Sequence, residues 1–139
     1  MEPVITVAAL ARLHFDHGWP LASLGLQSRD YAFDIVAFVG NDDVEHIGGE
    51  VKKTATEAEH LIRLVQEFAQ GEVTDPNELK GKELNAYRKL TALRSRKIPV
   101  FWVVGPGGFS RVFSVEHGQD GYAKFREVSE AILKRLSAE

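Results

Sequence analysis

Two segments joined by a short polar turn place the strongest constraint on the fold of this chain. The first, residues 31–39, is rich in β-branched and aromatic side chains, as strands are. The second, residues 44–53, combines small, apolar and charged residues, and the turn between them (residues 40–43) reads Gly-Asn-Asp-Asp. This order predicts a β-hairpin whose two strands pair antiparallel.

Three ionisable side chains within this hairpin point to chemistry. Asp34 lies among apolar neighbours, where an ionised carboxylate is costly unless it is paired or binds a metal. Glu50 and Lys52 are two residues apart, so in a strand their side chains point to the same face. Two carboxylates and an ammonium converging on a sheet predict a hydrolytic site with a divalent metal. The alternative is a domain with an unrelated ligand, in which Glu50 and Lys52 form only an ion pair.

The remaining pattern predicts an α/β fold with a mixed β-sheet flanked by helices. Helices are expected over residues 4–17, 56–70, 76–96 and from about 119 onward, and further strands over residues 21–26, 99–104 and 111–115.

Local signals mark the ends of these elements. Gly18 and Pro20 end the first helix, Thr56 with Glu59 forms a capping box for the second, and Asp75-Pro76 opens the third. In the last helix, the side chains expected to face the core are Tyr122, Phe125, Val128, Ile132 and Leu136.

The length and composition narrow the class of protein. A chain of 139 residues predicts one domain, residues 1–139. The sequence has no cysteine, which excludes disulfides, zinc–thiolate sites and cysteine nucleophiles. No apolar run approaches the roughly 18 residues of a membrane span, and the start Met1-Glu2-Pro3 lacks the basic residues of a secretory signal. We therefore expect a cytoplasmic protein that does not enter a membrane.

The third predicted helix is locally basic although the whole chain has a net charge of −3. Lys82, Lys89 and Arg96 recur every seven residues, which places them along one stripe of a helix. This stripe is interpreted either as a solvated face or as a surface that contacts phosphates.

Two further motifs have simpler interpretations. His14 and His17 share one helix three residues apart and could hold a metal, but a solvated helix end explains them as well. Residues 105–108 (Gly-Pro-Gly-Gly) lack the pattern of a phosphate-binding loop and predict a hairpin turn.

The hairpin and its surroundings resemble the PD-(D/E)xK nuclease superfamily. The resemblance covers about residues 5–70 and lies in His17-Gly18-Trp19, Asp34-Ile35-Val36 and the run from Gly49 to Thr54, which are similar to the cores of archaeal Holliday-junction resolvases and restriction-type nucleases. It implies a restriction-endonuclease-like fold.

The resemblance also implies roles for individual residues. Asp34 and Glu50 would bind Mg²⁺ or Mn²⁺ together with the carbonyl of Val51, and Lys52 would orient or activate the attacking water. The substrate would be DNA, with RNA not excluded, and the residues expected to contact it are Lys53, Lys82, Lys89 and Arg96. The chain could act as a homodimer or as a subunit of a larger nuclease system.

The sequence departs from the family pattern at two places. Ala32-Phe33 stands before Asp34 where the family name has a proline, and Val7-Ala8-Ala9 stands in the first helix where many members have a further acid. Two hypotheses therefore stay open: a metal-dependent nuclease, and a catalytically inactive nuclease-fold module that binds nucleic acid or serves in assembly.

Overall fold

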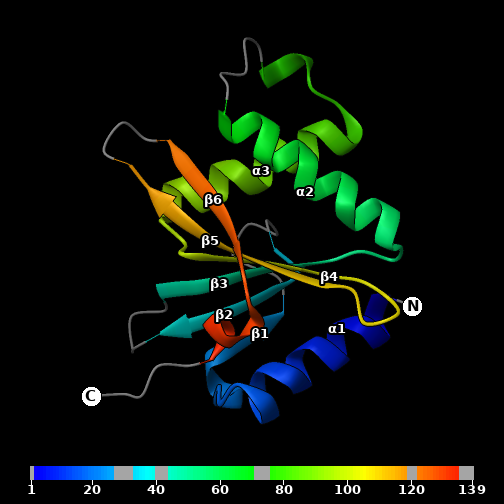
Figure 1. The fold of residues 1–139 in the computed structure, drawn as a ribbon, viewed down its shortest axis with the longest axis vertical. Coiled ribbons are helices and arrows are strands. Elements are labelled where there is room, and N and C mark those ends of the chain that lie inside the picture. Colours follow the sequence, from blue (N-terminus) through cyan, green and yellow to red (C-terminus); the bar gives the residue numbers. More distant parts are fainter. Residues whose placement is uncertain (1, 27–32, 40–43, 71–75, 119–121, 135–139) are drawn as a thin grey trace.

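A six-stranded sheet with helices on both faces forms the fold in the computed structural model, which describes residues 2–26, 33–39, 44–70, 76–118 and 122–134 (Figure 1). The helices are α1 (Glu2–Ala11), extended by a π-helical turn (Arg12–Asp16), α2 (Ala55–Gln70) and α3 (Gly81–Arg96), with short 3₁₀ turns at Leu21–Ser23, Pro76–Glu78 and Glu130–Leu133. The strands are β1 (Leu24–Leu26), β2 (Ile35–Val39), β3 (Val44–Val51), β4 (Val100–Val104), β5 (Ser110–His117) and β6 (Ala123–Val128). The predicted mixed sheet flanked by helices is confirmed.

The strands lie side by side in the order in which they occur along the chain. All neighbours pair antiparallel except β3 and β4, which run parallel. Parallel neighbours need a long crossover, and α2 and α3 provide it. The predicted hairpin is confirmed, because Ile35 of β2 pairs with Gly49 of β3 and Ala37 pairs with Ile47.

The core consists of two apolar clusters, one on each face of the sheet. In β4, Phe101 and Val103 point toward α2 and α3, whereas Val100, Trp102 and Val104 join the cluster on the side of α1. This alternation follows from the two-residue period of a strand. The same rule turns Glu50 of β3 toward α2 and α3, because its neighbour Val51 packs on the side of α1.

The C-terminal helix that we predicted is absent from the described part of the chain. Residues 123–128 instead form β6, which pairs with β5, and a 3₁₀ turn follows. The apolar residues at 122, 125 and 128 have helical spacing, but pairing with the free edge of β5 satisfies the backbone and lets Phe125 pack against Phe101 and Phe113. Leu136 lies outside the described residues.

The starts of α2 and α3 also differ from the prediction. Thr54, not Thr56, caps α2. Its hydroxyl accepts a hydrogen bond from the N–H of Glu57 at 3.1 Å. Thr54 and Glu57 have the same Thr-x-x-Glu spacing as the predicted pair Thr56 and Glu59, two residues earlier in the chain. α3 begins at Gly81, and Pro76 begins only a 3₁₀ turn.

The buried face of α1 and its π-helical extension is not the one indicated by the near-helical spacing of Val4, Val7, Ala8, Ala11 and Phe15. Ala9 and Leu13 are buried, while Val4, Val7 and Phe15 are exposed. The segment is apolar on all sides, so its spacing alone did not distinguish the face that packs on the sheet.

Candidate functional site

Asp34 directly precedes β2 in the chain and lies beside the C-terminal end of β3. Its backbone N–H donates to the carbonyl of Gly49 (3.0 Å), and its carboxylate accepts the N–H of Val51 (2.9 Å). The N–H of Lys52 points the other way, toward Val104 of β4 (2.9 Å). Because the N–H and C=O of one strand residue face the same neighbour, the Val51 carbonyl lies on the side of Asp34.

Glu50 extends from β3 beneath α3, where it meets Lys89. The Lys89 ammonium lies 2.8 Å from Oε2 of Glu50, and both side chains are 6% exposed. The contact is an ion pair, but it is not aligned as a hydrogen bond to that oxygen. Lys89 also lies 5.8 Å from the centre of the Phe33 ring. The carboxylate of Glu50 is thus held by a lysine that the predicted site did not include.

Burial raises the pKa of Glu50 to about 8. The Lys89 charge opposes this increase, whereas the charge of Asp34 and a hydrogen bond with its side chain add to it. Asp34 therefore lies close enough to Glu50 for its charge to raise the pKa of Glu50. Burial thus favours the protonated form of Glu50, whereas the Lys89 ammonium favours its ionised form.

This pKa predicts an unusual pH dependence of stability. Glu50 binds its proton more tightly in the folded chain than in the unfolded chain. The protonated side chain therefore contributes most to the free energy of unfolding at acid pH, and this contribution is lost as pH rises toward 8. Relative to Glu50→Gln, the free energy of unfolding of the wild type should fall by up to about 1.4 kcal/mol per pH unit between roughly pH 5 and 8. Urea unfolding at several pH values measures this difference.

Glu59→Gln, which neutralises an exposed acid of α2, is the matched control, and its curve should run parallel to that of the wild type. Parallel curves for Glu50→Gln and the wild type over the same range would contradict the raised pKa.

The predicted basic stripe of α3 faces β3 instead of solvent. Lys89 pairs with Glu50, and Arg96 donates from Nη1 to both oxygens of Glu45, at 2.8 and 3.1 Å. The prediction that this stripe is solvated or contacts phosphates is therefore wrong for Lys89 and Arg96. The seven-residue spacing does place them on one side of α3, but that side packs on the sheet, where each pairs with a carboxylate of β3. Lys82 remains exposed at the start of the helix.

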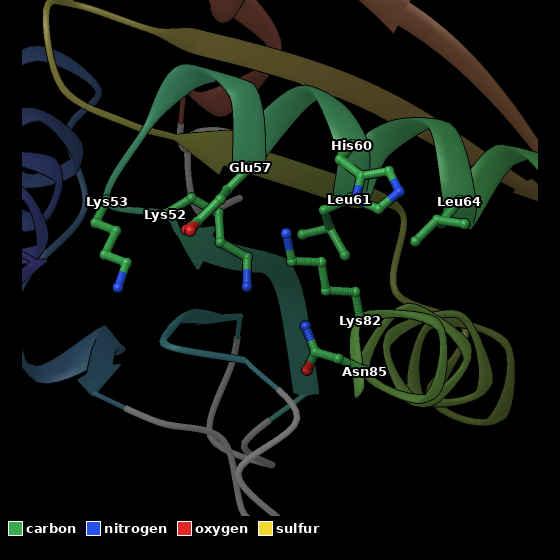
Figure 2. Close-up of a pocket in the computed structure, with 8 residues that line it drawn as sticks. All are labelled: Lys52, Lys53, Glu57, His60, Leu61, Leu64, Lys82 and Asn85. Carbon is green, nitrogen blue, oxygen red and sulfur yellow. The ribbon is translucent and has the colours of Figure 1, made fainter. Parts of the chain in front are cut away.

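A pocket of about 220 Å³ opens between the N-terminal parts of α2 and α3. Its lining residues are Lys52, Lys53, Glu57, His60, Leu61, Leu64, Lys82 and Asn85. Figure 2 shows Lys52 and Lys82 extending their ammonium groups into the same space above Asn85, with Lys53 at the rim. Lys52 follows Glu50 by two residues, which is about 7 Å along an extended chain. Lys52 therefore links the strand end that carries Glu50 to the pocket, whose lining does not include Asp34 or Glu50.

None of the three pocket lysines forms an ion pair within the described residues, although Glu57 lines the same pocket. Unpaired like charges that are held together repel one another and favour an anionic occupant. The arrangement also does not support the alternative in which Glu50 and Lys52 simply pair, because the partner of Glu50 is Lys89.

Sequence reasoning missed Lys89 as the partner of Glu50, and it missed His60 and Asn85 as pocket residues. The sequence did contain a signal for Lys89 and Asn85. Lys82, Asn85 and Lys89 follow one another at intervals of three and four, so they share one helix face. His60 lies three residues after Glu57 on α2, but nothing in the sequence shows that this face meets α3.

The two minor motifs have structural roles. The Nδ1 atom of His14 lies 2.7 Å from the Trp19 carbonyl, and His17 lies 3.7 Å from a carboxylate oxygen of Glu130, so the two rings are engaged separately. Residues 105–108 connect β4 to β5, as the hairpin prediction required. Gly107 and Gly108 adopt positive φ angles of 71° and 78°, which favour glycine.

The oxygen donors near Asp34 suit a hard divalent cation. Two carboxylates and one backbone carbonyl are the ligand types that Mg²⁺ and Mn²⁺ prefer. Within the described ranges there is no cluster of three or more His, Asp or Glu side chains, and the two acidic ligands that these residues would offer a metal here are Asp34 and Glu50. Water and a substrate phosphate would complete its shell.

Comparisons with protein-family models, with curated proteins and with solved structures find no match for this chain. In the described part of the chain, no helix is both long and apolar enough to cross a membrane.

Proposed function

We propose that this chain is a restriction-endonuclease-like, metal-dependent nuclease that hydrolyses phosphodiester bonds of DNA. The observation that carries this proposal is the meeting of Asp34, Glu50 and the Val51 backbone at one end of the β2–β3 pair, beside a pocket that contains Lys52. The order of α1, the β2–β3 hairpin and α2 supports the same assignment. RNA has the same phosphodiester chemistry and serves as the comparison substrate.

Each residue has a definite task in this proposal. Asp34 and Glu50 hold the metal, with the Val51 carbonyl as a third ligand. A bound Mg²⁺ or Mn²⁺ would stabilise charge on the phosphate and make water more acidic. Lys52 extends its ammonium into the pocket, where it can orient the attacking water and offset the charge that develops on the phosphate.

Lys89 gives Glu50 a partner in the absence of metal. Binding of a cation requires loss of the Glu50 proton and a shift of the Lys89 ammonium away from Oε2, so we expect weak metal binding until substrate supplies further ligands. The same ion pair is the observation that favours the second candidate function, a nuclease-fold module that binds nucleic acid without cutting it.

Strand scission separates the two candidates. The wild type should cut plasmid, single-stranded or branched DNA in Mg²⁺ and faster in Mn²⁺, and Asp34→Asn should lose this activity. The asparagine can still accept the hydrogen bond from Val51, so the variant should remain folded. If the wild type binds DNA but cuts no substrate in either metal, the second candidate is the function.

A further inference from the structure

The pocket between α2 and α3 holds more positive charge than an internal phosphate of a nucleic acid needs. Lys52, Lys53 and Lys82 contribute three ammonium groups and Glu57 contributes one carboxylate, which leaves a net charge of about two positive. An internal phosphodiester has one negative charge, whereas a terminal phosphate monoester has about 1.5 to 2 at neutral pH.

The geometry points to a receptor for the terminal phosphate of a nucleic-acid strand, an inference that rests on the proposed function. A monoester offers three free oxygens, one more than a diester, and it needs donors from several directions. The pocket supplies them from two helices and a strand end: Lys82 and Asn85 from α3, His60 from α2, and Lys52 from the chain after β3.

The shape of the pocket agrees with a strand end. Leu61 and Leu64 of α2, which are 4% and 8% exposed, contribute apolar surface, and the packed helices close the pocket on that side. A strand that ends in the pocket would leave past Lys52, the residue that also adjoins Glu50. A linkage close to the phosphorylated end would then lie at the two carboxylates, so the pocket would direct cutting to positions near strand ends.

Binding measured without metal tests this inference directly. Three single-stranded oligonucleotides of one sequence, with a 5′-phosphate, a 3′-phosphate or hydroxyl groups at both ends, are titrated in EDTA at one ionic strength. One of the phosphorylated oligonucleotides should bind about tenfold more tightly than the hydroxyl form, as expected for charge-assisted hydrogen bonds. The tighter one identifies which end the pocket takes.

The double variant Lys53→Gln/Lys82→Gln should lose this preference while remaining folded, because both lysines are exposed. Lys80→Gln/Lys124→Gln removes the same charge from exposed positions outside the pocket and should retain it. Equal binding of all three oligonucleotides by the wild type would overturn the inference, as would a preference that survives in Lys53→Gln/Lys82→Gln.

The outcome is independent of cutting. A preference for a phosphorylated end in a protein that cuts nothing would leave the pocket assignment in place and reject the proposed function. Metal-dependent cutting without such a preference would support the proposed function and reject the pocket assignment.

Discussion

Lys52→Ala should reduce DNA cleavage by roughly 10²- to 10⁴-fold, the range for loss of a positioned proton-transfer or charge-stabilising group. Lys52 is the cation nearest in sequence to Glu50 that no described carboxylate pairs with, and its side chain lines the pocket. Binding of DNA with hydroxyl ends should change little, because one lysine supplies a small part of the phosphate contact. Single-turnover cleavage and metal-free binding measure the two quantities separately.

Lys124→Ala removes an equal charge from an exposed position on β6 and is the control for that experiment. Its cleavage rate should match the wild type. A Lys52→Ala protein that cleaves at the wild-type rate would remove Lys52 from the mechanism, and one that loses binding and cleavage in equal proportion would make it a binding residue only.

Lys89→Met should destabilise the fold by about 3 kcal/mol at pH 9, because it leaves the buried Glu50 carboxylate without a counter-charge. The loss should be smaller at pH 6, where burial keeps Glu50 protonated. Adding Glu50→Gln should recover most of the stability at pH 9, since the double variant contains no buried charge at this place. Chemical unfolding of the two single variants and the double variant forms the cycle that isolates the pair.

Lys82→Met is the matched substitution seven residues earlier on the same helix. Lys82 is exposed, so its replacement should change the free energy of unfolding by no more than about 0.5 kcal/mol. Equal effects of Lys82→Met and Lys89→Met, or additive effects of Lys89→Met and Glu50→Gln, would mean that the Glu50–Lys89 pair does not exist in solution.

The hairpin and its two carboxylates could be predicted from sequence because the information is local. The turn composition at residues 40–43 fixes an antiparallel pair, and the two-residue period fixes which side chains share a face. The observed β2–β3 pairing accordingly brings Asp34 beside the end of β3 that carries Glu50. The turn residues themselves lie outside the described part of the chain.

The role of Lys89 could not be predicted in the same way. Its spacing from Lys82 and Arg96 shows a shared helix side, but not whether that side faces solvent or the sheet. The answer depends on Glu50 and Glu45, which lie on a strand 39 residues before Lys89 and 51 residues before Arg96, respectively. Contacts between elements so far apart are set by the packing of the whole domain, which helical periodicity does not encode.

The C-terminal segment illustrates competition between local pattern and tertiary context. Tyr122, Phe125 and Val128 have the spacing of a helix face, yet residues 123–128 complete the sheet beside β5. β-structure depends on an available partner strand more than on intrinsic preference. A segment whose apolar spacing is ambiguous therefore forms a strand when the edge of a sheet is available for pairing, as the edge of β5 is here.

A crystal structure of the protein soaked with Mn²⁺ and a short oligonucleotide would show whether Asp34 and Glu50 bind a metal beside the nucleic acid. We expect a Mn²⁺ ion at roughly 2.0–2.6 Å from carboxylate oxygens of Asp34 and Glu50 and from the Val51 carbonyl, with a phosphate oxygen in its shell and the Lys89 ammonium moved away from Oε2 of Glu50. A structure in which nucleic acid is bound, Glu50 still pairs with Lys89 and no ion lies beside Asp34 would contradict this expectation.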